Sequence, residues 1–424
     1  MAGIVSSEPL ISVIIPAYNS EETVARAVCS VLDQSYEHLE VVVVDDGSSD
    51  GTSRVVRELM EEDSRVRLIQ KANGGVSAAR NDGIRAAFGT WFLTLDADDY
   101  IDPDMLRRLW ETAADTEADV VICGFRMVYD NGRKKAFRVE EDYTDDKEEF
   151  IDAMFVDLYD RHMISTHSNK LYSMEIVWRD QIWYNERLAV NEDIDFVLRY
   201  LRSCMTISLI RGVYLNYVQQ ETGKSLNTTF QDYGVASSLL ILRDCDALFS
   251  DLELSDHTFD RMNNRLLMHI CSFVGLMYYR SGYSDEDKLH QLEKLCEEEE
   301  FQQLLEDTRP RGLKLTLAHF LLKHGLVMQY HQLCRLFYRS KGADFPPDGS
   351  RRPGDDGFDL LDEPRPKVPV RTRANDGIDT ELIEAAMREE QEKSACEGDF
   401  RVRKEDMEEV SQRLDSDSFS EENL

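Results

Sequence analysis

Three aspartates at the end of an apolar run are the residues of this chain best placed to do chemistry. Asp96, Asp98 and Asp99 follow directly on residues 91–95, a short aromatic and branched run with Gly89 before it, which predicts a buried strand. Carboxylates at the mouth of a buried strand repel one another unless a cation or donors compensate them. The cluster therefore predicts a site for a hard divalent cation, Mg²⁺ or Mn²⁺, that carries a phosphorylated ligand.

An alternative for these acids is that they cap the following helix. Capping accounts for Asp102, which precedes Pro103 at a predicted first helical position. It does not account for the three cluster aspartates together, so the metal–phosphate interpretation is preferred.

The elements that position this cluster alternate between strand and helix, with short connections. Apolar runs predict strands at 11–15, 40–44, 66–69, 91–95 and 119–123, and helical spacing predicts helices from Asn19, over 52–60, from Gly74–Gly75 and over 103–114. This order predicts an α/β fold, a single Rossmann-like, mixed and mostly parallel sheet with helices on both faces. Ligands of such sheets bind beyond the carboxyl ends of the strands. Residues 16–19, 45–48 and 96–99 all lie at those ends.

Composition excludes several classes of protein. The formal net charge of -33 over 424 residues argues against nucleic acid as a partner. Eight scattered cysteines without a Cys-x-x-Cys pair predict neither a zinc site nor a disulfide framework, and indicate a reducing compartment. No basic region precedes the first apolar run, and no run approaches the roughly 18 apolar residues of a spanning helix. We expect a cytoplasmic protein, with peripheral attachment at the inner face of the plasma membrane as a hypothesis.

Five motifs, taken in order, resemble those of family 2 glycosyltransferases with the glycosyltransferase-A fold, over about residues 9–220. They are Pro-Ala-Tyr-Asn at 16–19, the run from Asp45 to Thr52, Gly-Val-Ser-Ala-Ala-Arg-Asn at 75–81, Asp-Ala-Asp-Asp at 96–99 and Asn-Glu-Asp at 191–193. The resemblance implies an inverting enzyme that moves a hexosyl or N-acetylhexosaminyl group from a nucleotide-sugar, most simply a UDP-sugar, to an acceptor hydroxyl. It implies an acceptor in polysaccharide or glycolipid synthesis, including a lipid-linked one.

The resemblance also implies where the donor binds. Asp46 accepts the imide N–H of uracil, with Pro16, Tyr18 and Glu22 near the nucleoside. An ordinary turn is the alternative for residues 45–48, because Asp and Gly are turn formers.

The predicted helix after Gly74–Gly75 is suited to the donor's phosphates. Its first N–H groups, including that of Gly75, could face a diphosphate. Arg80 follows one to two turns later and could hold phosphate or sugar as a bidentate donor. The alternative is a surface arginine on an amphipathic helix.

The remaining roles divide among acids. Asp98 is the predicted direct metal ligand, Asp96 reaches the metal through water or contacts the ribose, and Asp99 contacts the donor sugar. The metal then neutralises the leaving diphosphate as a Lewis acid. The resemblance puts the general base in the Glu192–Asp193 pair, with Asp193 first and Glu192 as the second choice or as a group that orients the acceptor.

Two features limit these roles. Acids favour the first turn of a helix because of its dipole, so Glu192 and Asp193 have a purely structural alternative. Relatives often place an arginine after tyrosines such as Tyr214 and Tyr217, followed by a serine, whereas Val218 and Gln219 stand here before Ser225.

The predicted domains are a catalytic domain at 9–225, a helical region at 226–341 and an acidic, proline-bearing tail at 342–424 that is largely disordered. Residues 308–343 contain no acid in a chain dominated by acids. Their basic residues are Arg309, Arg311, Lys314, Lys323, Arg335, Arg339 and Lys341, and their interleaved apolar residues are Leu313, Leu317, Phe320, Leu321, Leu326, Leu333, Leu336 and Phe337. This pattern resembles an interfacial segment, which gives the hypothesis that 309–341 meets an anionic membrane surface. The alternative is a helix pair that closes a core.

Two other functions fit the sequence less well. A sugar nucleotidyltransferase uses a Gly-rich loop with Arg or Lys directly after its first strand, where this chain has residues 16–19 instead. A non-catalytic binding protein on the same fold would not need the full set of carboxylates.

Overall fold

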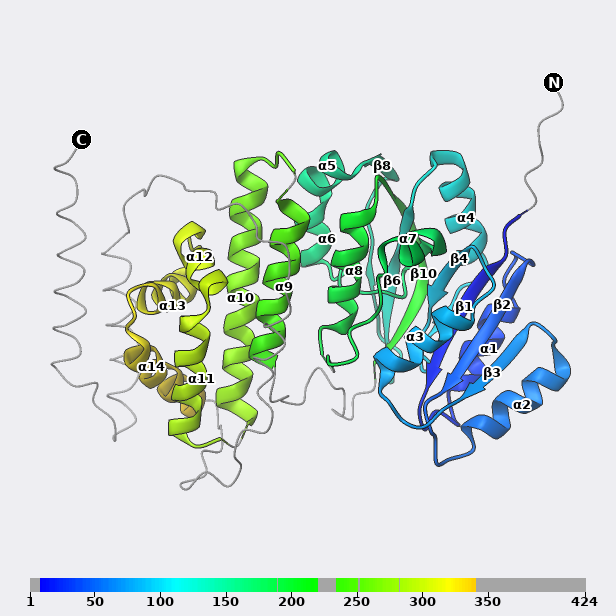
Figure 1. Ribbon diagram of the computed structural model, residues 1–424, viewed down its shortest axis with the longest axis horizontal. Helices are drawn as coiled ribbons and strands as arrows, with labels where there is room; N and C mark the ends of the chain where they lie inside the picture. The colour runs from blue at the N-terminus through cyan, green and yellow to red at the C-terminus, as the bar shows by residue number, and fades with distance from the viewer. Residues whose placement is uncertain (1–7, 189, 220–233, 251, 282, 341–424) are drawn as a thin grey trace. The chain divides into compact units, whose positions relative to one another are not determined.

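A computed structural model describes residues 8–188, 190–219, 234–250, 252–281 and 283–340 (Figure 1). The chain divides into two compact units. The first comprises residues 1–228 and 244–258, and the second comprises residues 229–243 and 259–424. The predicted tail at 342–424 lies outside the described residues, as does Ser225.

The described part of the first unit is built on one mixed sheet. Four parallel strands form its N-terminal half in the order β3-β2-β1-β4, and these are β1 Ile11–Ala17, β2 Leu39–Asp45, β3 Val66–Gln70 and β4 Trp91–Thr94. The sheet continues through β9 Lys170–Ser173, β6 Val120–Tyr129, β10 Thr206–Gln219 and β5 Tyr100–Ile101. β7 Lys134–Phe137 pairs with β6, and β8 Tyr143–Asp146 pairs with β10. The predicted fold class, a mixed and mostly parallel α/β sheet, is confirmed.

β9 differs from its two neighbours in direction. It runs antiparallel to both β4 and β6, with Trp91 opposite Ser173 and Phe92 opposite Tyr172. The beginning of β9, rather than its end, therefore lies toward the carboxyl end of β4.

Helices connect the parallel strands. They are α1 Val24–Leu32, α2 Thr52–Glu62, α3 Val76–Ala86 and α4 Met105–Thr116. The chain moves outward from β1 to β3 through α1 and α2, then returns through α3 to β4 on the other side of β1. Because parallel crossovers are right-handed, this reversal puts α3 on the face opposite α1 and α2. Gly83 lets α3 approach β1 closely, since a Cβ there would lie 2.3 Å from Cγ2 of Ile14.

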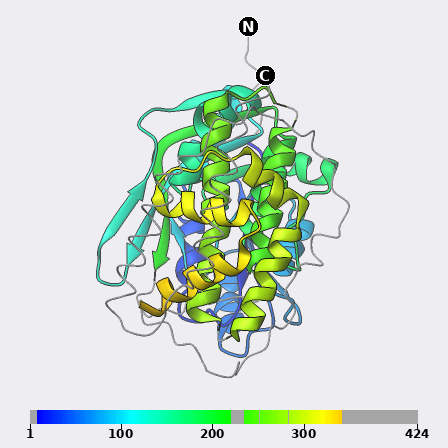
Figure 2. The ribbon, with the colours of Figure 1, turned by 90° about the vertical axis from the view of Figure 1, so that its left-hand side faces the viewer.

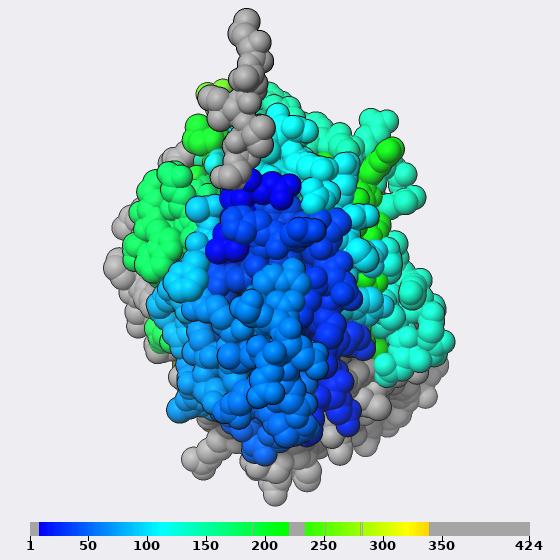
Figure 3. Space-filling view, turned by 90° about the vertical axis from the view of Figure 1, so that its right-hand side faces the viewer, coloured from blue at the N-terminus to red at the C-terminus, as the bar shows by residue number. Residues whose placement is uncertain are grey.

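The parallel half of the sheet supplies the core of the unit. Every residue of β1 and β2 is buried. This is typical of central strands in a parallel sheet, whose two faces are both covered by helices. In the space-filling view of Figure 3 the N-terminal segments, blue to cyan, cover most of the face shown. These buried strands form the base from which the loops at their carboxyl ends extend.

Later helices complete the first unit. They are α5 Lys147–Phe150, a π-helical turn at Ile151–Phe155, α6 Val156–Asp160, α7 Met174–Asp180 and α8 Glu192–Ser203. α8 begins at Glu192, so Glu192 and Asp193 lie in the first turn of a helix, as their structural alternative assumes.

Two predicted helix starts are wrong. The helix expected from Asn19 begins at Val24. Asn19 instead has a φ of 49° and accepts a hydrogen bond from the Ser49 amide at 2.8 Å. A side chain that satisfies the neighbouring turn is not available to cap a helix.

The helix expected from Pro103 begins at Met105. Asp102 does not cap it with its side chain. Its carboxylate pairs with Arg126 at 3.1 Å and accepts from Asn216 at 2.8 Å. The long-range partners on β6 and β10 were not visible from local sequence.

The elements that the structure describes in the second unit are helices, joined by short loops (Figure 2). Its helices are α11 Asp285–Glu297, α12 Glu299–Asp307, α13 Leu313–Lys323 and α14 Val327–Ser340, together with parts of α9 Gly234–Phe249 and α10 Asp256–Arg280. In the described part of the chain, no helix has the length and apolar character needed to cross a bilayer.

The acid-free segment forms α13 and α14. Leu317, Phe320, Leu321 and Leu326 are buried, whereas Leu313, Leu333, Leu336 and Phe337 are half-buried. Three of its cations have partners inside the unit: Lys323 pairs with Glu306 at 3.1 Å, Arg335 pairs with Asp285 at 2.8 Å, and Lys314 lies over the Phe337 ring. Half of the predicted apolar set therefore closes a core.

Candidate functional site

The sheet order reverses between β1 and β4, and the predicted site residues follow the carboxyl ends of the strands on both sides of that reversal. Asp46 follows β2, Pro16 is the second-last residue of β1, and the aspartate cluster follows β4. Such a reversal is where ligands of open α/β sheets bind. The structure thus brings the first four motifs to one edge.

Asp46 is the most tightly held of these groups. Its Oδ1 accepts from the Gly74 amide at 2.9 Å and its Oδ2 accepts from the Gly75 amide at 2.8 Å. Lys71 Nζ lies 3.3 Å from Oδ1. The Gly75 N–H, predicted to face a diphosphate, is therefore engaged by Asp46, and the turn before α3 is fixed by a carboxylate of β2.

The other residues predicted near a nucleoside are open to solvent or part of the sheet. Tyr18 is 54% exposed and Glu22 is also exposed, whereas Pro16 is buried in β1. The neighbouring Glu21 makes the local contacts, since it accepts from the Gly51 amide at 3.0 Å.

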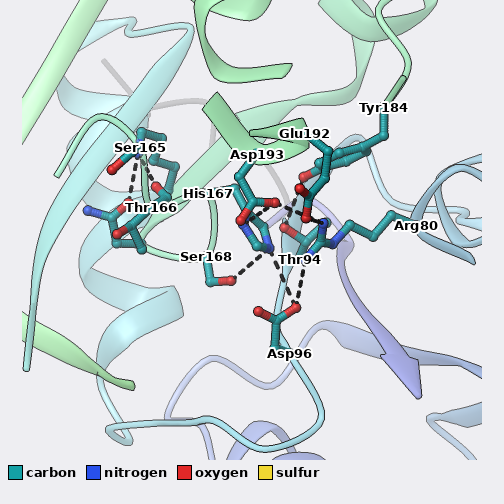
Figure 4. Close-up of polar contacts among 12 residues, drawn as sticks. Arg80, Thr94, Asp96, Ser165, Thr166, His167, Ser168, Tyr184, Glu192 and Asp193 are labelled. Atoms are coloured by element: carbon teal, nitrogen blue, oxygen red, sulfur yellow. Dashed lines mark hydrogen bonds and ion pairs between the residues drawn. The ribbon is translucent and has the colours of Figure 1, made fainter. Parts of the chain in front are cut away.

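Arg80 lies at the centre of the site (Figure 4). It is 2% exposed, so it is not the surface arginine of the alternative interpretation. Its Nη1 donates to Asp193 Oδ1 at 2.8 Å and to Glu192 Oε1 at 3.2 Å, and its Nη2 donates to Asp96 Oδ1 at 2.9 Å. The guanidinium also lies over the Tyr184 ring, 5.1 Å from its centroid. One cation thus joins the acids that follow β4 to the acids that open α8.

The pKa values of Glu192 and Asp193 are shifted in opposite directions. Burial and the charge of Asp193 raise the pKa of Glu192 to about 7. For Asp193 burial opposes ionisation, but the charges of Arg80 and His167 overcome it and hold its pKa below the ordinary range. A pair whose pKa values are pushed apart is typical of acid–base sites.

The aspartate cluster after β4 is short of compensating charge. Burial and the charge of Asp96 raise the pKa of Asp98, although this residue keeps much of its surface in solvent. Asp99 is 1% exposed, and burial together with Asp96 and Asp98 raises its pKa well above the ordinary value. Its Oδ1 accepts from the Val218 amide at 2.8 Å, but its Oδ2 is buried without a hydrogen-bond partner.

The chemistry of this donor set suits a divalent cation, because carboxylate oxygens are hard ligands and Oδ2 of Asp99 has no hydrogen-bond partner. Within the described ranges, no group of three or more His, Cys, Asp and Glu side chains is arranged to hold a metal ion.

His167 was missed by sequence reasoning. It is 2% exposed, and its Nδ1 lies 2.9 Å from Asp193 Oδ1 while its Nε2 lies 3.7 Å from Asp96 Oδ1. The residue precedes β9, whose antiparallel direction puts its beginning near the end of β4. A search restricted to residues after predicted parallel strands could not find it. The polar run His167–Lys170 before an apolar segment was the available signal.

Tyr217 has no role predicted from the sequence. Burial, and then the charges of Asp99, Asp96 and Asp193, raise its pKa. The phenol of β10 therefore lies within electrostatic reach of both groups of acids.

Solved structures define the class of fold. Staphylococcus aureus TarS 1–349, described as a complex with UDP-GlcNAc, matches with a TM-score of 0.56 and 19% identity over 81% of this chain and 99% of that one. The complex of the same protein with UDP matches with a TM-score of 0.54 over 78% and 91%. The chain has the glycosyltransferase-A fold.

The sequence comparisons identify the family. The model described as glycosyl transferase family 2 matches residues 12–180. The uncharacterized glycosyltransferase EpsJ of Bacillus subtilis is 32% identical over 216 residues, which are 49% of this chain and 60% of that protein. The succinoglycan biosynthesis protein ExoO of Rhizobium meliloti is 43% identical over 126 residues, 30% of this chain and 36% of its own length. Residues 12–180 are a family 2 glycosyltransferase domain, in a chain that spans less than two thirds of these curated relatives.

Proposed function

We propose that this chain is an inverting glycosyltransferase that moves a hexosyl or N-acetylhexosaminyl group from a nucleotide-sugar, in the first place a UDP-sugar, to an acceptor hydroxyl. One observation carries the proposal. Buried Arg80 bridges Asp96, on the side of the predicted donor site, to the Glu192–Asp193 pair, which is the predicted acid–base site. Transfer to an alcohol needs a leaving-group site and a base held in fixed relation to each other.

Asp46 is the proposed base-recognition residue. A carboxylate offers about four lone-pair positions, and the Gly74 amide, the Gly75 amide and Lys71 use three of them. One position remains for the single imide N–H of uracil. The TarS structures, described as complexes with UDP and UDP-GlcNAc, support this choice of donor.

Asp98 and Asp96 are the proposed residues for Mg²⁺ or Mn²⁺, with Asp99 beside the donor sugar. The orphaned Oδ2 of Asp99 and the raised pKa values of Asp98 and Asp99 support a cation at this place. When bound, such an ion would offset negative charge on the leaving diphosphate. Asp98 and Asp96 would hold the ion, which would supply Lewis-acid chemistry next to the diphosphate of a bound donor.

Asp193 is the proposed base, with Glu192 as the competing candidate. A base acts best with a pKa near the working pH, which favours Glu192 at about 7. Position favours Asp193, whose side chain is 32% exposed against 13% for Glu192, because an incoming hydroxyl must reach it. The Asp193 carboxylate would take the hydroxyl proton as the oxygen attacks the anomeric carbon and the bond to the diphosphate breaks.

Three measurements test this function. Donor binding is followed by thermal shift across a panel of nucleotide-sugars with Mn²⁺, since a ligand of the folded state stabilises it by linkage. Asp98→Ala should lose the Mn²⁺-dependent part of that shift, whereas Asp115→Ala, an exposed acid of α4, should keep it. Asp193→Asn should keep the shift and lose transfer by about 10²- to 10⁴-fold. Full transfer by Asp193→Asn would move the base to Glu192.

Stereochemistry tests the inverting mechanism separately. A product in which the sugar has the anomeric configuration opposite to that of the donor is expected. Retention of the donor's configuration would refute a single displacement with Asp193 as its base.

The acceptor is proposed from the relatives. ExoO is named for succinoglycan biosynthesis, and a chondroitin synthase of Pasteurella multocida is 43% identical over 96 residues, 23% of this chain and 10% of that protein. We propose a growing polysaccharide or glycolipid as the acceptor. Residues 309–341 are proposed as a weak contact with anionic lipid through the half-buried Leu333, Leu336 and Phe337. Failure to float with anionic liposomes would remove this contact.

A further inference from the structure

The imidazole of His167 lies between Asp96 and Asp193, and hydrogen bonds hold the backbone of its segment. Tyr172 donates its hydroxyl to the His167 carbonyl at 3.0 Å. Lys170, buried completely, donates to the carbonyl of Met163 at 2.7 Å and also to that of Thr166. Asn169 anchors the same segment to the Cys123 carbonyl at 2.8 Å. Residues at the start of β9 therefore hold the backbone before them, and the ring has little freedom to swing.

The hydrogen bonds of the ring settle which atom donates to Asp193. A neutral imidazole has one donor and one acceptor nitrogen. Nδ1 lies 2.9 Å from Asp193 Oδ1, which can only accept while Asp193 is ionised, so Nδ1 carries the hydrogen. Nε2 lies 3.0 Å from the Ser168 hydroxyl, which can donate to a neutral ring or accept from a protonated one. His167 therefore donates to Asp193 in either state.

Arg80 and His167 share one oxygen of Asp193. The Arg80 contact of 2.8 Å and the His167 contact of 2.9 Å both end on Oδ1. Neither donor bonds to Oδ2. Glu192 also hydrogen-bonds this side chain. The two contacts at Oδ1 therefore restrain the orientation of the Asp193 carboxylate within a group of three partners.

We propose that His167 is a positioning residue for the base, which restrains the Asp193 carboxylate in the orientation that takes the acceptor proton. Through Nε2 the same ring faces Ser168 and, at 3.7 Å, Asp96 on the donor side. His167 therefore lies, like Arg80, between the donor side and the base. This inference rests on the proposed role of Asp193 and goes beyond it, since neither the family match nor the relatives name His167.

Three variants separate positioning from simple structural support. His167→Leu removes both polar contacts. His167→Asn keeps an N–H donor near the position of Nδ1 and loses Nε2. Ser168→Ala removes only the Nε2 partner and serves as the matched control. Each is compared with the wild type in kcat and KM for transfer, in donor-induced thermal shift, and in unfolding midpoint.

A misplaced catalytic group costs about 10²-fold in rate. We expect His167→Leu to lower kcat about 100-fold, with the KM for the donor and the donor-induced thermal shift within about twofold of wild type. His167→Asn should recover at least tenfold of that loss, and Ser168→Ala should stay within about threefold of wild type. Recovery by asparagine is the readout that a merely structural role would not give.

The outcomes distinguish this inference from the proposed function. If Asp193→Asn loses transfer while His167→Leu keeps the wild-type kcat, His167 does not position the base, and the proposed function stands. If His167→Asn is as impaired as His167→Leu at equal donor binding and equal unfolding midpoint, the Nδ1 contact is not the cause and the inference is wrong. If Asp193→Asn retains transfer, the base has been assigned wrongly, and this inference fails with it. A lowered midpoint for His167→Leu alone leaves His167→Asn as the deciding variant.

Discussion

Replacing Arg80 by methionine removes the cation that holds three carboxylates while keeping an unbranched stem of similar length. The guanidinium is buried and lies within 3.2 Å of Asp96, Glu192 and Asp193. Each attraction is worth about 4 kcal/mol at an effective dielectric constant of about 20. Burial of the guanidinium and repulsion among the acids offset most of that sum. Removing one partner of a buried ion pair costs about 3–5 kcal/mol.

Solvent exposure of two of the acids places the expected loss of stability at the lower end of this range. The side chains of Asp96 and Asp193 are 28% and 32% exposed, so water screens their charges in the variant. We expect the free energy of unfolding of the first unit to fall by about 3 kcal/mol at pH 8.

The loss should depend on pH. Arg80 holds the pKa of Asp193 below its ordinary value and opposes the rise in the pKa of Glu192. Without it both pKa values rise, so the folded variant binds protons that the unfolded chain does not. Stability of the variant then increases as the pH falls, at up to about 1.4 kcal/mol per pH unit for each extra proton. In the wild type the contribution of Asp193 is present at both pH 8 and pH 5.5, because both lie above the pKa of an aspartate in the unfolded chain. We expect the difference to shrink by about 1–2 kcal/mol at pH 5.5.

Tryptophan fluorescence gives a selective assay. The four tryptophans of the chain, Trp91, Trp110, Trp178 and Trp183, all belong to the first unit. Urea unfolding of wild type, Arg80→Met and Arg80→Lys is followed by this signal at pH 8 and pH 5.5. Arg80→Lys keeps the charge without the planar fork and should fall between the other two. An equal loss for Arg80→Met at both pH values would mean that packing, not charge, is the contribution of Arg80.

Further predictions concern single substitutions in the first unit. Glu192→Gln removes a carboxyl whose folded pKa of about 7 exceeds its unfolded value, so wild type loses stability as the pH rises through 7 and the variant does not. Relative to wild type, the variant should gain up to about 3 kcal/mol between pH 5 and pH 8 in urea unfolding, and a constant difference would contradict the assigned pKa. Gly83→Ala should cost about 1–3 kcal/mol because its Cβ meets Ile14 Cγ2, and Ile14→Ala should cost less in that background than alone. Asp99→Asn keeps an acceptor for the Val218 amide and removes a carboxyl whose ionisation is opposed by burial and by Asp96 and Asp98, so we expect a higher thermal midpoint together with lower transfer. A lowered midpoint would show that the charge is already compensated.

The elements of the parallel half were predictable from the chain because each is a local pattern. The apolar runs of β1, β2 and β4 are buried strands, and the Gly74–Gly75 turn opens α3 where expected. Strand order then follows from handedness and short connections, which explains why Asp46 and Asp96 could be placed on one edge from the sequence.

Errors in the prediction arose where a side chain has a distant partner. Asn19 and Asp102 are residue types that often cap helices. Here Asn19 accepts from the Ser49 amide, and Asp102 binds Arg126 and Asn216. Capping preferences describe a helix in isolation, and a tertiary hydrogen bond of similar strength overrides them.

The sequence by itself determined the fold, the family of residues 12–180 and the edge of the sheet where chemistry is proposed, because strand periodicity and motif order are written along the chain. Only the tertiary structure decided that Arg80 is buried between two groups of acids and that His167 stands beside Asp193. The physical reason is the direction of β9. An antiparallel strand brings its beginning to the edge where parallel strands end, and no local pattern in the sequence states which way a strand will pair.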